Sequence, residues 1–75
     1  LPTGNYIVWV AAGVEAGMYT VQTDGTVKKI AGSTNAVATD SDTDLCLFDN
    51  GTRARVRNRL GSTQTVVVLA VAFAE

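Results

Sequence analysis

The chain has 75 residues, of which 47% are hydrophobic and 17% are charged, and its net charge is −1. This length predicts a single domain over residues 1–75. The near-neutral charge argues against a nucleic-acid partner, because general nucleic-acid binders usually carry a basic surface. One cysteine and no histidine exclude an internal disulfide and disfavour a zinc site, so no cofactor is expected. Small domains without a disulfide or a structural metal usually gain stability from partners, which favours an oligomer or a piece of an assembly.

The two ends of the sequence bear on its context. The chain begins with Leu1 where an initiator methionine would stand, so we expect a processed chain or a part of a longer protein. The longest apolar run, Val66–Ala74, has nine residues, whereas a membrane-spanning helix needs about 18 or more. This run has the length of a long strand, and no membrane partner is expected.

The N-terminal half is predicted to hold a strand followed by a hairpin. Tyr6–Ala11 has few polar positions and is typical of a strand. Gly17–Gln22 and Thr26–Ile30 are predicted to pair around Asp24-Gly25, because both residues tolerate the positive φ of a tight turn. Between this hairpin and the next, the expected elements are a loop over Ala31–Asn35 and a short strand over Ala36–Thr39.

The C-terminal half is predicted to form a three-stranded meander. Asn50-Gly51 is the strongest short-range hairpin signal, and Gly61-Ser62 suits a second tight turn. The strands that these turns join are Asp44–Phe48, Thr52–Leu60 and Thr63–Phe73. Abundant Val and Thr, regular turn signals and the absence of a helical period favour an all-β fold, a small antiparallel β-sandwich or β-barrel.

Four arginines recur at every second position of one predicted strand and share one face of it. This arginine ladder consists of Arg53, Arg55, Arg57 and Arg59. A two-residue turn at Asn50-Gly51 would place Asp44 opposite Arg57 and Asp42 opposite Arg59. The pattern predicts ion pairs that set the register of the hairpin, and an anion site is the alternative interpretation.

The last strand is apolar on both faces. In the predicted meander, Val67, Leu69 and Val71 lie on the core side. The opposite, arginine-side row has no evident cover within the chain and is predicted to contact a neighbouring subunit. That row consists of Val66, Val68, Ala70 and Ala72, and Phe73 is expected to belong to the same interface.

Other motifs suggest weaker alternatives. Asp40-Ser41-Asp42-Thr43-Asp44 resembles the start of a calcium loop, but Leu45 stands where the EF-hand needs glycine. Asn50-Gly51-Thr52 matches a glycosylation sequon that the predicted turn already explains. Without histidine, a Ser–His or Cys–His nucleophile cannot form within this chain, and we expect no enzymatic activity.

The run Asp49–Gly61 (DNGTRARVRNRLG), followed by a Thr/Val-rich strand, resembles the C-terminal ends of small β-rich virion proteins of tailed bacteriophages. These include capsid decoration proteins and head or tail fibre modules, and the resemblance covers mainly residues 44–75. It implies a structural role in a virion, commonly as a homotrimer in contact with other virion proteins, and it brings no catalytic residue.

The sequence therefore predicts a non-enzymatic structural module of a viral particle, such as a capsid decoration protein or a head fibre base. Its apolar strand faces would bury against other copies of the chain. The alternative is a receptor- or carbohydrate-binding module of a tail fibre or adhesin, because aromatic residues of small β modules sometimes form sugar platforms. A glycan is the ligand that this alternative requires.

Overall fold

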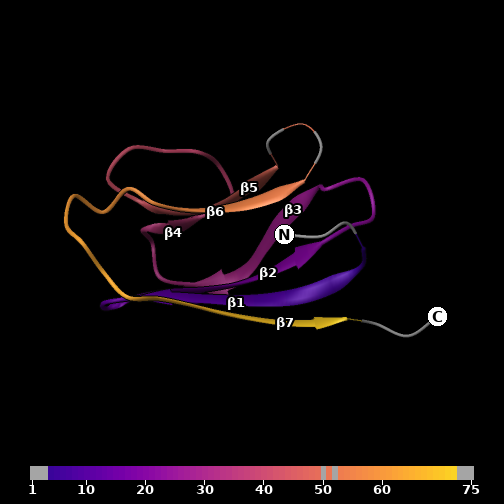
Figure 1. Ribbon diagram of the computed structural model, residues 1–75, viewed down its shortest axis with the longest axis horizontal. Helices are drawn as coiled ribbons and strands as arrows, with labels where there is room; N and C mark the ends of the chain where they lie inside the picture. The colour runs from indigo at the N-terminus through magenta and orange to yellow at the C-terminus, as the bar shows by residue number, and fades with distance from the viewer. Residues whose placement is uncertain (1–3, 50, 52, 73–75) are drawn as a thin grey trace.

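The computed structural model describes residues 4–49, 51 and 53–72, and these residues form seven strands in two layers (Figure 1). The strands are β1 (Tyr6–Ala12), β2 (Glu15–Val21), β3 (Val27–Gly32), β4 (Ala36–Val37), β5 (Leu45–Asp49), β6 (Ala54–Asn58) and β7 (Val66–Ala72). None of the described residues belongs to a helix long and apolar enough to cross a membrane.

Four strands form sheet A in the order β3-β2-β1-β7, and three form sheet B in the order β4-β5-β6. Neighbouring strands are antiparallel except for β4 and β5, which are parallel. The predicted all-β sandwich is confirmed, and so is the hairpin at Asp24-Gly25, where β2 pairs with β3 from Val21 opposite Val27. The Asp24 carboxylate accepts the Thr26 N–H at 2.9 Å and supports this turn.

The predicted C-terminal meander is wrong. Strand β7 does not continue beside β6 but crosses through residues 59–65 to sheet A, where it pairs with β1. Pairing with β6 would have placed Val66 and Val68 beside the arginine side chains. In sheet A the same residues face the inside of the sandwich opposite Ala12 and Val10. The apolar strand thus joins an apolar neighbour, which keeps like surfaces together.

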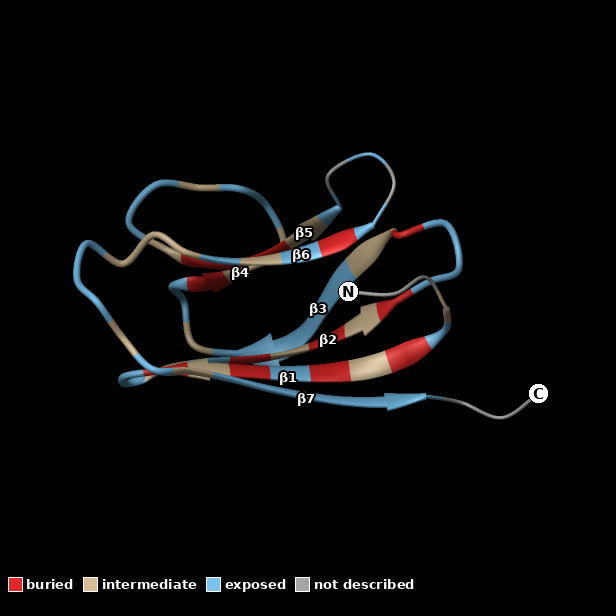
Figure 2. Ribbon diagram, in the orientation of Figure 1, coloured by how far each residue is buried: buried red, intermediate tan, exposed pale blue. Residues whose placement is uncertain are grey.

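The core lies between the two sheets and follows the two-residue period of the strands. Along β1, buried residues alternate with more exposed ones, as the red segments of Figure 2 show. Sheet B contributes the fully buried Leu45 and Leu47. The buried cluster comprises Tyr6, Val8, Val10, Ala12, Tyr19, Val21, Leu45, Leu47 and Ala54.

Gly17 makes room for the largest core side chain. A Cβ atom at this position would come within 2.7 Å of the Tyr19 hydroxyl, because the Tyr19 ring lies back over Gly17 on the same strand face. The Tyr19 hydroxyl is buried and has no hydrogen-bond partner among the described residues. Burial, with a smaller contribution from Cys46, raises the pKa of Tyr19 to about 12.

Candidate functional site

The arginine ladder lies on the outer face of sheet B, and its register differs from the predicted one by two residues. Asp49 pairs with Ala54, so residues 50–53 connect the strands instead of a two-residue turn. Phe48 pairs with Arg55 and Cys46 with Arg57. Because successive side chains point to opposite faces, a shift of two keeps every residue on its predicted face and changes only its partner.

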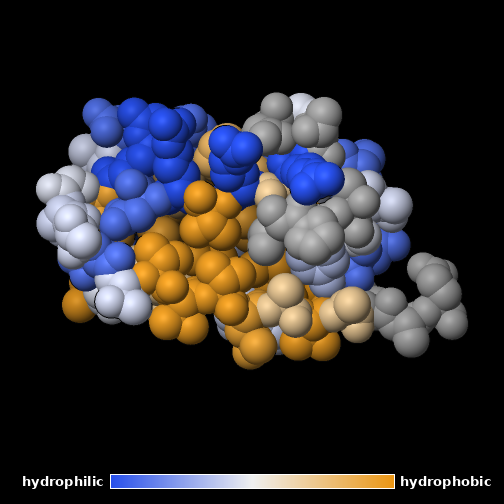
Figure 3. All heavy atoms as spheres, viewed as in Figure 1, coloured by the Kyte–Doolittle hydropathy of each residue, from blue (hydrophilic) through white to orange (hydrophobic). Residues whose placement is uncertain are grey.

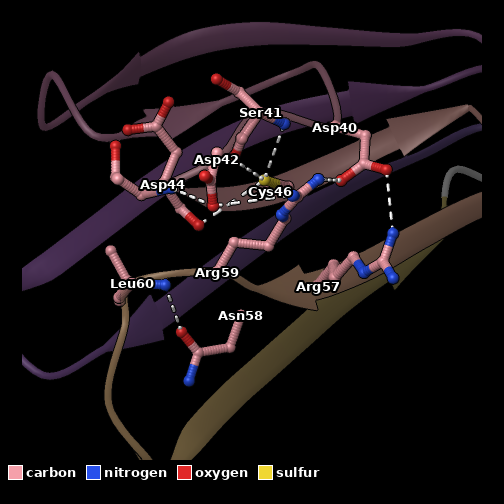
Figure 4. Close-up of polar contacts among 10 residues, drawn as sticks. Asp40, Ser41, Asp42, Asp44, Cys46, Arg57, Asn58, Arg59 and Leu60 are labelled. Carbon is pink, nitrogen blue, oxygen red and sulfur yellow. Dashed lines mark hydrogen bonds and ion pairs between the residues drawn. The ribbon is translucent and has the colours of Figure 1, made fainter.

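Asp40 is the main partner of the ladder (Figure 4). One of its carboxylate oxygens accepts a hydrogen bond from Arg57 at 2.9 Å, and the other accepts one from Arg59 at 3.0 Å. The Asp42–Arg59 pair is present at 3.6 Å. The predicted Asp44–Arg57 pair is wrong. The shifted register places Cys46 opposite Arg57, and Arg57 forms its ion pair with Asp40 instead.

These ion pairs hold the segment 40–44 across the outer face of sheet B. The hydrogen bond from Arg59, followed by the charge of Arg57, holds the pKa of Asp40 below its usual value of 3.8. The Arg59 pKa is raised in turn, first by its hydrogen bond to Asp40. Both partners therefore stay charged over the whole physiological pH range, which suits a permanent structural tie.

Cys46 lies beneath this segment and is fully buried. The Ser41 N–H donates to its sulfur at 3.4 Å, and the thiol donates to the carbonyl oxygens of Ser41 and Asp44 at 3.3 and 3.6 Å. The Arg59 N–H also donates to the Asp44 carbonyl at 2.9 Å. The segment 40–44 is thus a lid over Cys46 that two arginines fasten.

The structure gives no support for a metal site at the calcium-like run 40–44. Within the described ranges 4–49, 51 and 53–72, no three His, Cys, Asp or Glu side chains are grouped to hold a metal ion. Asp40 of the calcium-like run faces two arginines instead. The sequon residues Asn50 and Thr52 lie outside the described residues. A polar hollow of about 590 Å³ beside residues 61–64 includes Arg59 and Asp42, which already pair with each other.

Strand β7 forms the second candidate surface, at the free edge of sheet A. Its predicted interface row now faces the inside of the sandwich: Val66 is half-buried, Val68 is 41% exposed, and Ala70 and Ala72 are exposed. Phe73 lies outside the described residues. The row that the meander assigned to the core is also exposed, since Val67 is 60%, Leu69 57% and Val71 48% accessible. That assignment is wrong, because β7 pairs with β1 and its residues Val67, Leu69 and Val71 share the outer face of sheet A with Ala11, Trp9 and Ile7.

The exposed row of β7 continues across β1 and β2. Leu69 is opposite Trp9, which is 40% exposed, and Trp9 is opposite Met18. We call this surface the outer face of sheet A; it comprises Val67, Leu69, Val71, Ile7, Trp9, Ala11, Ala16 and Met18. Residues Tyr6–Ala11 are apolar on both faces of the strand, which was the sequence signal for this face, but the sequence did not show that β7 would extend it.

A shallow hollow of about 380 Å³ opens on this face beside Trp9, where the small residues Ala11, Ala16, Gly17 and Gly32 lower the surface. Its remaining lining residues are Val10, Met18 and Ala31, so no polar side chain lines it. Sugar sites combine an aromatic ring with hydrogen-bonding groups that fix the hydroxyls. The surroundings of Trp9 therefore suit an apolar protein contact better than a glycan.

Comparison of the chain with models of protein families, with curated proteins and with solved structures found no match.

Proposed function

We propose that the protein is a non-enzymatic structural module that assembles with further copies of itself through β7 and the outer face of sheet A. The observation that carries this proposal is the exposure of Val67, Leu69 and Val71 on an uncharged edge strand. Soluble monomers rarely leave large apolar side chains together on a surface, and such patches usually mark an interaction site.

The edge of β7 supports self-association by a second property. A free edge strand presents unpaired backbone groups, and proteins usually protect it with charges, proline or a covering segment. Strand β7 has the sequence Val-Val-Val-Leu-Ala-Val-Ala, without a charge or a proline, and no other described strand pairs with its outer edge. A second copy of β7 could approach it in antiparallel orientation without bringing like charges together, and both copies would bury the same surface.

The size of the surface indicates that face and edge act together. Strands β7, β1 and β2 each have seven residues and span a face of roughly 14 by 23 Å from the usual strand spacing and rise. A standard stable interface buries about 800 Å² on each partner, which is more than this face alone provides. We therefore include the free edge and the inner row of β7 in the assembly surface.

The proposal extends to a viral particle as the setting. The resemblance favours a trimer there, which would use β7 and the outer face of sheet A in a head-to-tail contact, because an antiparallel β7–β7 pair by itself closes a dimer. This part rests on the resemblance of residues 44–75 to small virion proteins of tailed bacteriophages. Peptide mass spectrometry of purified particles would detect the chain at many copies per virion if the setting is correct. Absence of the chain from such particles, with self-association intact, would remove the viral setting and keep the structural role.

Sedimentation velocity with a Leu69→Arg variant tests the self-association. The wild type is expected to sediment as an oligomer at micromolar concentration, and the variant as a folded monomer, because the arginine would bring like charges together at the assembly surface. Circular dichroism would confirm that both chains retain the β fold.

Val14→Arg is the matched control, because Val14 is 96% exposed at the turn between β1 and β2 and lies off the proposed surface. It introduces the same charge and should leave the oligomer unchanged. A wild-type chain that remains a stable monomer at high micromolar concentration would contradict the proposal.

A further inference from the structure

Sheet A has two edges of different chemistry. Its outer strands are β3 and β7, and no other described strand pairs with the outer side of either. Strand β7 contains no charged residue and no proline, and hydrophobic surface follows it on the side of the molecule shown in Figure 3. Strand β3 contains Lys28 and Lys29, which are both exposed. The two edges of one sheet therefore differ in how readily they accept another strand.

The directions of the four strands would allow sheet A to continue from one copy to the next. Each strand is antiparallel to its neighbour, so β3 and β7 run in opposite directions. A copy displaced sideways without being turned over would place its β3 antiparallel to the β7 of the first copy. The two strands have six and seven residues, so their lengths also match. Contacts that repeat from copy to copy without closing a ring form open filaments.

The lysines of β3 lie on both sides of this edge. Lys28 is opposite Thr20 and points to the same side as the outer face of sheet A, whereas Lys29 is opposite the buried Tyr19 and points to the inner side. The register then shifts at Ile30, which has no partner on β2. Edge charges, inward-pointing charges and bulges are features by which proteins protect a free edge against strand addition.

We propose that Lys28 and Lys29 prevent the β7 strand of another copy from adding to the β3 edge, and thereby keep the assembly from growing into an open-ended sheet. The inference rests on the proposed use of β7 for self-association. A β7 strand added beside β3 would place both ammonium groups next to apolar side chains. An ammonium group among apolar neighbours loses hydration without gaining a partner.

Desolvation, rather than repulsion between copies, is the cost that the lysines impose. Successive copies in such a sheet would be four strands apart, which is roughly 19 Å at the usual strand spacing. This distance exceeds the screening length of about 8 Å at physiological ionic strength. Lysines of neighbouring copies would therefore interact weakly, and a negative charge at the same positions should protect the edge as well as a positive one.

Electron microscopy and ultracentrifugal pelleting of a Lys28→Thr/Lys29→Thr variant test the inference. Threonine removes both charges and keeps a polar side chain that suits a strand. The variant is expected to form long filaments at a critical concentration at least about tenfold below that of the wild type, because no charge has to be desolvated. If the double variant does not fold, Lys28→Thr alone should still lower the critical concentration, and an unchanged value would overturn the inference.

Lys28→Glu/Lys29→Glu is the matched control, since it alters the same two positions but keeps them charged, and it should form no filaments. Adding Leu69→Arg to the threonine variant should abolish the filaments, because β7 supplies the other edge of each contact. Filaments formed by the glutamate variant, or filaments that persist with Leu69→Arg, would overturn the inference.

The outcomes also separate this inference from the proposed assembly. A wild-type oligomer whose size the threonine substitutions leave unchanged would overturn the inference and leave the proposed assembly intact. Filaments of the threonine variant together with a monomeric wild type would contradict the proposed assembly and leave the inference intact.

Discussion

The outer faces of the two sheets differ in whether another described segment of the chain covers them. On sheet B, the segment 40–44 folds back over the strand surface and Asp40 contacts two arginines of the ladder. On sheet A, no described segment covers the corresponding face, where Trp9 and Leu69 remain 40% and 57% exposed. Among the described residues, the chain thus covers part of the polar outer face of sheet B and leaves the apolar outer face of sheet A exposed.

This difference indicates which residues serve stability and which serve contact. Four arginines on one strand would ordinarily suggest a binding site for anions. The structure shows two of them fastening a lid over Cys46. The apolar outer face of sheet A is the surface that we propose for association, because burial of large apolar side chains is the main driving force of association.

The largest effect on stability is expected from truncating two leucines, one in the core and one exposed on β7. Leu47→Ala should lower the free energy of unfolding by about 2–5 kcal/mol, since it opens a cavity in a close-packed core. Leu69→Ala should lower it by less than about 1 kcal/mol in the monomer, because the side chain is largely hydrated there. Urea unfolding at submicromolar concentration measures both.

These values depend on 0% exposure for Leu47 and 57% for Leu69. Equal losses for the two variants would show that β7 is packed within the monomer, which would contradict its role as an open surface. A stronger effect of Leu69→Ala at high protein concentration than at low concentration would support the assembly.

A smaller effect is expected at the lid. Asp40→Asn removes the charge that holds Arg57 and Arg59, so the segment 40–44 should open more often and expose the Cys46 thiol. Alkylation of Cys46 by iodoacetamide should become faster by at most about fivefold, the range expected for exposed ion pairs. Asp24→Asn, at the β2–β3 turn, should leave the alkylation rate unchanged.

The smallest effect is a pH dependence with a defined sign. The folded-state pKa of Asp40 is lowered by Arg59, so its ion pairs stabilise the protein above the ordinary value of 3.8 and the contribution is lost as the pH falls through the lowered pKa. The stability difference between wild type and Asp40→Asn should therefore be constant near neutral pH and disappear in acid. A difference that persists at the lowest pH would assign the effect to packing.

Several features of the fold were predictable from local pattern. The Asp24-Gly25 hairpin follows from turn chemistry between two short strands. Strands β5 and β6 are antiparallel neighbours as predicted, but their register differs by two residues from the one that a two-residue turn at Asn50-Gly51 gives. The faces of the arginine ladder also followed correctly, because the two-residue period of a strand is insensitive to an error of two in register. The acidic partner of Arg57 was not predicted correctly. The four-residue connection 50–53 shifts the register, so Arg57 pairs with Asp40 and not with Asp44.

By itself, the sequence determined the all-β class, the β2–β3 hairpin, the antiparallel pairing of β5 with β6 and the presence of a last strand too apolar for a solvated sheet, because these depend on neighbours within a few residues. Only the tertiary structure decided that β7 joins β1, that the segment 40–44 covers Cys46, and that sheet B ends one strand short of sheet A. These features depend on which distant surfaces meet, and the apolar face of β1 offered β7 a better neighbour than the arginine face of β6. The last strand therefore lies beside β1 at the edge of sheet A, with most of its described residues exposed, rather than at the end of a meander.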